Sequence, residues 1–208
     1  MNEYKTKQEA VWAGAFGDAY NTRNAGSALI ASNLLFFSRS LSHAAAPASC
    51  LEFGANIGLN LQALRLLFPN QDQHAVEINS LAAAQLRALL PPAQVHEMSI
   101  LDFTPERTFD LVLIKRVLVH ICPEALPKVY DKMRAATGRY LLVAEEYSPS
   151  PVEMSYRDHS ERLFKRDFCG EILDRYADLR LIDYGFVYHR DPNWPQDDIN
   201  WFLMENSR

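Results

Sequence analysis

The sequence predicts an α/β protein built on a doubly wound, mostly parallel sheet. The first observation is a short apolar stretch, 49–53, followed by glycines at 54 and 58 and then by leucines at helical spacing, typical of strand, tight turn and helix. The second is the alternation of strand-like and helix-like segments from residue 48 onward. The third is Phe109–Ile114, a continuous apolar run of the kind buried in parallel sheets.

Composition narrows the classes of protein further. The 208 residues are 48% hydrophobic and 23% charged, as expected for one soluble domain, 1–208. A net charge of -5 argues against sequence-independent nucleic-acid binding, which requires a basic surface. The sequence shows no secretory signal and no bilayer-spanning run, and its three cysteines lie outside any C-x-x-C motif. We therefore expect a cytoplasmic protein with free thiols and without a membrane, nucleic-acid or metal partner; the oligomeric state stays open.

Two extra helices are expected before the first strand. Thr6 to Glu9 has capping-box spacing and predicts a helix to about Tyr20, and Ser27 is expected to cap a second helix to about Leu41. We expect residues 1–43 to form a helical lid on a core that spans 48–208.

Several side chains of this lid are candidates to cover a ligand crevice. They are Trp12, Tyr20, Arg23 and Asn24. The alternative for Trp12 and Phe16, that they form only the buried face of a packing helix, stays open.

The core elements follow in order. Strands are predicted at 49–53, 74–78, 94–98, 109–114, 140–144, 179–187 and 199–204, with helices at 58–68, 79–90, after Pro123 and at 167–176. Residues 148–166 are predicted to be a loop. The turn-rich stretch 189–198 predicts an antiparallel hairpin between the last two strands.

The glycine turn after the first strand is the expected ligand site. Gly54 and Gly58 allow a sharp turn and a close approach to a ligand, and Asn56 also tolerates a left-handed backbone. The spacing does not fit the dinucleotide motif G-x-G-x-x-G, and the Gly-Lys-Ser/Thr of a phosphate loop is absent.

What remains, Glu52-x-Gly54-x-Asn56-x-Gly58, resembles the E/D-x-G-x-G-x-G signature of class I S-adenosylmethionine-dependent methyltransferases, with Asn56 in place of the middle glycine. The resemblance implies strand order 3-2-1-4-5-7-6 with the last strand antiparallel, and S-adenosyl-L-methionine as cofactor at the carboxyl ends of strands one and four. The same loop in an α/β protein of another function is the open alternative.

Two acidic residues extend this resemblance. Glu77 ends strand two, 23 residues after Gly54, where an acid binds a ribose diol. Asp102 follows strand three, and in the resembled family the loop at that position flanks the adenine. The alternatives are a surface acid for Glu77 and a turn cap before Pro105 for Asp102. The full expected cofactor set is Trp12, Arg23, Phe53, Gly54, Ala55, Asn56, Gly58, Glu77, Ile78, Ile100, Leu101, Asp102, Ile114 and Lys115.

The residues after strand four bear on the acceptor. Lys115 to Leu118 stand where amino-group methyltransferases often have Asn/Asp-Pro-Pro-Tyr, which argues against DNA amino methylation. Methyl transfer is an in-line displacement, and a hydroxyl acceptor needs a base. Catalytic candidates are His120, Tyr147 and His159, with Glu145 and Glu146 as further possible bases. His120 could equally be a buried imidazole that fixes a loop.

A basic segment suggests the charge of the acceptor. Its members, expected to bind substrate, are Tyr156, Arg157, Arg162, Lys165 and Arg166. Such cations in an acidic chain suggest an anionic small-molecule acceptor, although a solvated charged loop is the open alternative.

A narrower resemblance covers nearly the whole chain. Segments 11–24, 51–58, 156–168 and 183–191 resemble the pseudaminic acid biosynthesis-associated methylase family. This implies methyl transfer to a nonulosonic acid-type or nucleotide-activated sugar. Two rival functions stay open, an RNA or protein methyltransferase and a non-catalytic S-adenosylmethionine-binding subunit.

Overall fold

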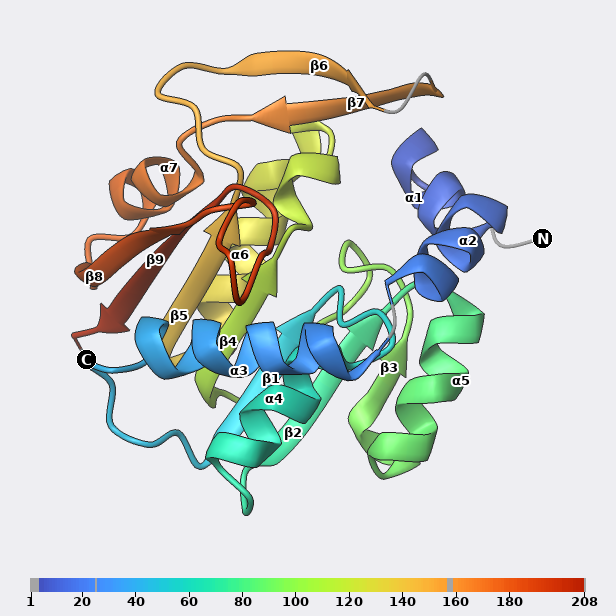
Figure 1. The fold of residues 1–208 in the computed structure, drawn as a ribbon. Helices are drawn as coiled ribbons and strands as arrows, with labels where there is room; N and C mark the ends of the chain where they lie inside the picture. The colour runs from blue at the N-terminus through green and yellow to red at the C-terminus, as the bar shows by residue number, and fades with distance from the viewer. Residues whose placement is uncertain (1–3, 25, 157–158, 208) are drawn as a thin grey trace.

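The structure is a computed structural model that describes residues 4–24, 26–156 and 159–207, with positions 155, 156 and 159–162 described by their backbone only. One seven-stranded sheet runs through its centre, with helices on both faces (Figure 1). Its strands are β1 (Ser49–Phe53), β2 (Asp72–Glu77), β3 (Val95–Glu97), β4 (Phe109–Lys115), β5 (Thr137–Glu145), β8 (Leu179–Val187) and β9 (Ile199–Asn206).

The strand order is β3-β2-β1-β4-β5-β9-β8. The first five strands pair in parallel, and β9 is antiparallel to both β5 and β8. Since β8 and β9 are the sixth and seventh strands of this sheet, the expected order 3-2-1-4-5-7-6 is confirmed. The winding reverses between β1 and β4, which leaves a crevice at their carboxyl ends.

The segment predicted as a loop, 148–166, contains two further strands. β6 (Val152–Tyr156) and β7 (His159–Lys165) form a separate antiparallel hairpin at the top of Figure 1. The loop prediction was wrong because β7 finds tertiary support: Leu163 is buried in the core and β7 packs against the turn after β4. Polar sequence alone does not reveal such pairing.

Helices cover the sheet in two layers. α3 (Ser27–Ser40), α4 (Leu59–Leu67) and α5 (Ser80–Leu89) contribute to the hydrophobic core on one face, and α6 (Leu126–Ala136) and α7 (Phe168–Arg175) to that on the other. Short 3-10 turns are η1 (Pro92–Gln94), η2 (Leu118–His120) and η3 (Pro123–Ala125). In the described ranges, no helix has the length and apolarity needed to cross a membrane.

The N-terminal region contains three helices rather than the two expected. The capping box is confirmed, because the Thr6 side chain accepts from the Glu9 amide and the Glu9 side chain accepts from the Thr6 amide. The single helix predicted to Tyr20 instead breaks at Gly14, whose extended backbone separates α1 (Lys7–Ala13) from α2 (Ala15–Arg23). Gly17 allows the tight junction, since a Cβ there would lie 2.0 Å from the Trp12 carbonyl oxygen.

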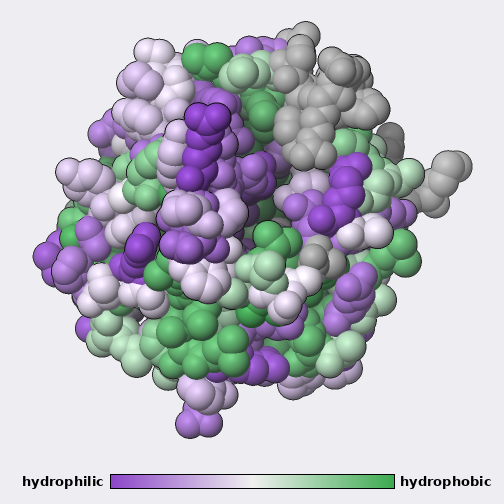
Figure 2. Space-filling model, in the orientation of Figure 1, coloured by the Kyte–Doolittle hydropathy of each residue, from purple (hydrophilic) through white to green (hydrophobic). Residues whose placement is uncertain are grey.

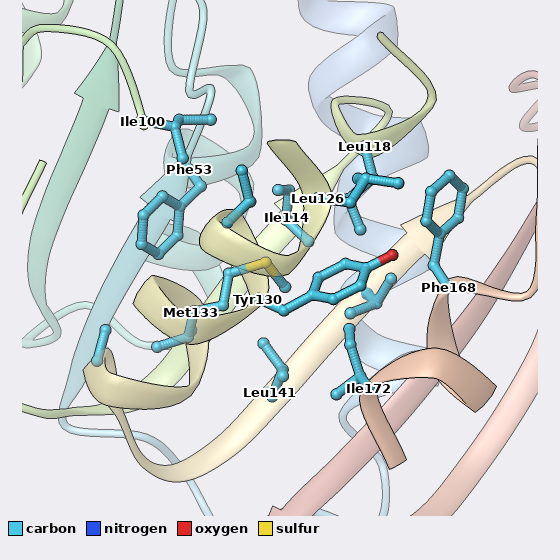
Figure 3. Packing of buried hydrophobic residues seen from close by; sticks show 14 of the residues in the cluster. Phe53, Ile100, Ile114, Leu118, Leu126, Tyr130, Met133, Leu141, Phe168 and Ile172 are labelled. Atoms are coloured by element: carbon cyan, nitrogen blue, oxygen red, sulfur yellow. The ribbon is translucent and has the colours of Figure 1, made fainter. Parts of the chain in front are cut away.

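The hydrophobic core beneath α6 supports β1 and β4, whose carboxyl ends border the crevice. Figure 3 shows Tyr130 and Met133 of α6 among side chains from β1, β4 and α7, including Phe53, Ile114 and Phe168. All five are at least 97% buried. Burial of each large apolar side chain contributes roughly 1.5–3 kcal/mol to stability, so this layer holds β1 and β4 firmly in place.

Gly54 packs against the segment that follows β4. Its backbone is left-handed, with φ of 71°, and an added Cβ would lie 2.5 Å from Cγ2 of Val117. The glycine therefore permits close contact between the loops after β1 and β4, in addition to the turn that its sequence position predicts.

β1 also buries a carboxylate. The side chain of Glu52 is 1% exposed; its Oε1 accepts a 2.6 Å hydrogen bond from Asn60 Nδ2, and its Oε2 has no partner among the described residues. Burial raises the pKa of Glu52 to about 8, against the opposing effects of Asn60 and Lys115.

We expect Gly54→Ala to destabilise the protein by about 1–3 kcal/mol, through the positive φ and the contact with Val117. Val117→Ala in the same chain should recover the steric part, so the double variant should lose less stability than the sum of the singles. Urea unfolding of the four proteins measures this coupling. Strictly additive losses would contradict the contact.

We expect the unfolding free energy to decline from pH 5 to pH 8 through Glu52. Its folded pKa, about 8, lies above that of the unfolded chain, so the native state holds the extra proton and loses stability as pH rises. Glu52→Gln should reduce this decline by on the order of 1–3 kcal/mol, whereas Glu124→Gln, at an exposed carboxylate, should not. Chemical unfolding at several pH values tests it, and parallel pH profiles for wild type and Glu52→Gln would contradict the assignment.

Candidate functional site

A cavity lies at the carboxyl ends of β1, β2 and β4, below the N-terminal helices. In Figure 2 a hollow near the centre of this face is bordered by hydrophilic side chains, whereas hydrophobic surface gathers lower down. Of the residues predicted to act here, the lining includes Trp12, Gly54, Ala55, Asn56, Glu77, Ile78, Ile100, Leu101, Lys115 and His120. Phe53, Gly58 and Ile114 support it from outside this lining.

The turn after β1 has three left-handed residues. Gly54, Asn56 and Gly58 have φ of 71°, 48° and 81°. Asn56 was expected to tolerate a left-handed backbone and adopts one, since asparagine is among the few residues that do so at low cost. α4 begins directly after Gly58.

Glu77 ties this turn to the next helix. Its Oε2 accepts from the Asn56 amide and its Oε1 from the Asn79 amide, both at 2.7 Å. Burial raises the pKa of Glu77, and the hydrogen bonds from these amides oppose that rise. The carboxylate is 7% exposed and lies on the cavity wall, so its remaining lone pairs can accept from a ligand.

The N-terminal helices are joined to the same turn by asparagine side chains. Asn56 Nδ2 donates to Asn21 Oδ1, and Asn21 Nδ2 donates to Asn79 Oδ1 at 2.9 Å. Asn79 Nδ2 donates in turn to Asp18 Oδ1 at 2.8 Å, while its Oδ1 caps α5. This chain of amides fixes α2 over the cavity.

A second contact joins α1 to the loop after β3. Ser99 Oγ donates to Glu9 Oε1, and the Leu101 amide donates to Ser99 Oγ at 3.0 Å. Ile100 and Leu101 thereby present an apolar edge of the cavity. Asp102 lies outside the cavity lining and forms an ion pair with Lys5.

Lys115, the last residue of β4, brings a cation to the cavity. Its Nζ donates to Asn33 Oδ1 at 3.0 Å and lies 5.3 Å from the centroid of the Phe36 ring. Burial lowers the pKa of Lys115 to about 8, with Arg116 adding to the effect and Glu52 opposing it. Arg23, the other expected cation, lies outside the cavity lining, near the ring of Phe16.

His120 is held in the short turn η2 and contacts the lid. Its ring centroid lies 4.6 Å from that of Trp12. Burial, with a smaller effect of Arg116, lowers the pKa of His120 to about 3, so the imidazole is neutral at physiological pH. Trp12 is thus both a cavity wall and a packing residue.

Glu145 fixes the turn that carries His120. Its Oε1 accepts from the amides of Val117 and Leu118, each at 2.8 Å, and its Oε2 from that of Val119 at 3.4 Å. Burial raises the pKa of Glu145 to about 7, and these amides oppose the rise. Glu145 itself lies outside the cavity lining, and because its oxygens bind the backbone amides of the turn, it supports the turn.

The other described candidates lie outside the cavity lining. Lys165 pairs with Glu146 at 2.6 Å and Arg166 with Glu171 at 2.5 Å, and neither cation lines the cavity. Tyr147 also lies outside the lining and is 41% exposed. Arg157 and the side chains of Tyr156, His159 and Arg162 lie outside the described residues.

Sequence reasoning missed part of the cavity wall. Arg116 and Asp197 line it, as do Gln196, Asn33 and Asn79. The place of Arg116 directly after β4 was a usable signal, because strand ends face the crevice. Gln196 and Asp197 come from the β8–β9 loop, and only the tertiary structure brings that loop to the cavity. Within the described ranges, no group of three or more His, Cys, Asp or Glu side chains is arranged to hold a metal.

Comparison with known proteins identifies the fold. No family model and no curated protein sequence matches the chain. Magnesium protoporphyrin IX methyltransferase from Synechocystis PCC 6803, solved with bound S-adenosylmethionine, is similar in structure, with a TM-score of 0.71 at 10% identity over 99% of this chain and 100% of that one.

Two further solved structures agree. The Burkholderia thailandensis 1,6-didemethyltoxoflavin-N1-methyltransferase gives a TM-score of 0.69 at 16% identity over 96% of this chain and 87% of that one. The sugar N-methyltransferase KedS8 from a Streptoalloteichus species gives 0.68 at 14% identity over 100% and 97%. The chain therefore has the fold of S-adenosylmethionine-dependent methyltransferases.

Proposed function

We propose that this chain binds S-adenosyl-L-methionine in the cavity and transfers its methyl group to a small-molecule acceptor. The observation that supports this best is the Glu77 carboxylate on the cavity wall beside the left-handed turn at the switch point of the sheet. A carboxylate in that place can accept both hydroxyls of a ribose.

The residues present fit such a cofactor. The Glu77 carboxylate accepts backbone amides, chiefly those of Asn56 and Asn79, and its two oxygens have lone pairs left for ribose hydroxyls. Ile100 and Leu101 offer an apolar surface for the adenine ring. Lys115 would pair with the carboxylate at the methionine end, because a buried cation gains most from a charged partner.

When bound, the cofactor supplies an electrophilic methyl group on a positively charged sulfur. The chain's own residues would orient the acceptor for in-line attack and exclude water. Trp12 closes the cavity over His120, and the low pKa of that imidazole suits a hydrogen-bond acceptor better than a group that stores a proton. Glu145 keeps the His120 turn in place.

For the acceptor, we propose a small anionic molecule, specifically a nonulosonic acid-type or nucleotide-activated sugar handled in the cytoplasm. Arg116, the other cation of the described cavity wall, supports the anionic class. Lys165 and Arg166 contribute less than their sequence suggested, since both are paired with glutamates. Unbridged thiols at positions 50, 122 and 169 support a reducing compartment.

Glu77→Gln should weaken binding of S-adenosylhomocysteine by about 1.5–3 kcal/mol, roughly 10- to 100-fold in Kd, because the charge-assisted hydrogen bonds to the ribose lose their anionic acceptor. Titration calorimetry measures the loss. Glu97→Gln is the matched control, since Glu97 pairs with Glu77 in register on the neighbouring strand and does not line the cavity. Equal Kd values for Glu77→Gln and wild type would remove the ribose assignment and, with it, the main support for the proposed function.

We expect the His120 imidazole to remain neutral from pH 5.5 to pH 8. Its pKa of about 3 lies below this window, so the C2 proton signal should stay constant in NMR spectra across it. The His120→Asn spectrum assigns the signal. A titration with its midpoint near pH 6 would contradict the inferred neutral state and favour a general base instead.

A further inference from the structure

Arg116 is the most unusual residue on the cavity wall. Among the described residues, it shares a positive φ only with Asn56 and glycines, and its own φ is 58°. Arginine adopts this conformation at a cost, so the surrounding structure must hold it. The Arg116 amide donates to the Ala144 carbonyl at 2.9 Å, and the amides directly after it donate to Glu145.

The guanidinium of Arg116 has two acidic neighbours of different character. Nη1 pairs with Asp197, and Nη2 lies 3.9 Å from Glu146. Glu146 is 18% exposed in its side chain and pairs with Lys165 at 2.6 Å, so its charge has another partner. The side chain of Asp197 is 59% exposed.

Asp197 reaches the cavity from the β8–β9 loop. Gln196 Nε2 donates to the Ser32 carbonyl at 2.8 Å, and His189 pairs with Asp198 at 2.9 Å. These contacts hold the loop on both sides of Asp197 without involving its carboxylate. The Asp197 side chain can therefore leave Arg116 while the loop stays in place.

We propose that Asp197 is an internal stand-in for the anionic group of the acceptor, and that a carboxylate or phosphate of the acceptor replaces it on Arg116. This inference rests on the proposed function and assigns acceptor recognition to a residue outside the basic segment. The planar fork of an arginine binds either oxyanion through two parallel hydrogen bonds. A partly buried guanidinium also needs a counter-ion whether or not the acceptor is present.

Replacing Asp197 on Arg116 by a ligand anion requires little structural change. The Asp197 side chain is 59% exposed, so its carboxylate regains water when it leaves Arg116, whereas a ligand oxyanion can form two parallel hydrogen bonds with a guanidinium that is 19% exposed. The left-handed backbone of Arg116 is already held by its hydrogen bond to Ala144, so the guanidinium does not have to be reoriented when the ligand binds. A neutral acceptor would gain nothing from displacing Asp197 and would be discriminated against.

Calorimetry with inorganic phosphate and with glucuronate, each in the presence of saturating S-adenosylhomocysteine, tests the exchange. Glucose is the neutral match for glucuronate. Asp197→Asn should tighten anion binding by roughly five- to tenfold, because the competing carboxylate is removed. Arg116→Gln should lose anion binding, and glucose should bind no better to Asp197→Asn than to wild type.

Asp198→Asn is the matched control. It removes the same charge from the adjacent position, and the asparagine keeps an Oδ1 that can accept from the His189 amide, so the loop stays held. Neither Asp198 nor His189 lines the cavity. If Asp198→Asn strengthens anion binding as much as Asp197→Asn, the effect is general electrostatics and the inference fails. It also fails if neither anion binds, or if Asp197→Asn binds no tighter than wild type. The comparison of the two aspartate variants decides the matter even where Arg116→Gln does not fold.

The same titrations separate this inference from the proposed function. Intact S-adenosylhomocysteine binding without the aspartate effect would overturn only the role of Arg116 and Asp197. If the wild-type protein does not bind S-adenosylhomocysteine at all, the proposed function itself is overturned.

Discussion

The hydrogen bonds of one buried carboxylate hold the cavity together. Glu77, at the end of β2, accepts the amides of Asn56 and Asn79 and so joins the turn after β1 to the start of α5. The carboxylate thereby holds the amide of Asn56, a left-handed residue, and burial outweighs these hydrogen bonds in raising the pKa of Glu77. This acid on the cavity wall is therefore also a structural element.

The lid depends on the same two asparagines. Asn21 bridges Asn56 and Asn79, and Asn79 also bonds Asp18, so α2 is placed by the residues that Glu77 fixes. On the other side, Glu145 holds the amides after β4 in the same manner, and Val117 of that segment packs against Gly54. Two buried carboxylates at strand ends thus hold backbone segments that line the cavity at Asn56, Asn79 and Val117. Burying these two carboxylates away from water costs free energy, which is reflected in the raised pKa values of Glu77 and Glu145.

More of the basic side chains near the cavity are paired with carboxylates than the linear sequence suggests. Lys165 and Arg166 meet Glu146 and Glu171, which leaves Lys115 and Arg116 as the cations of the described cavity wall. Lys115 lies deep, beside Asn33, and Arg116 lies toward the β8–β9 loop. The two cations of the cavity wall therefore have different neighbours, Asn33 for Lys115 and Asp197 for Arg116.

The sequence by itself determined the sheet, the glycine turn and the acid at the end of β2, because these follow from local periodicity and from backbone demands that few residues meet. It did not determine the break at Gly14 or the β6–β7 hairpin, since tertiary packing overrides local propensity there. Only the tertiary structure decided that Asp102 faces Lys5 and that Asp197 reaches Arg116. Such pairings join residues up to 97 positions apart, and no local pattern records them.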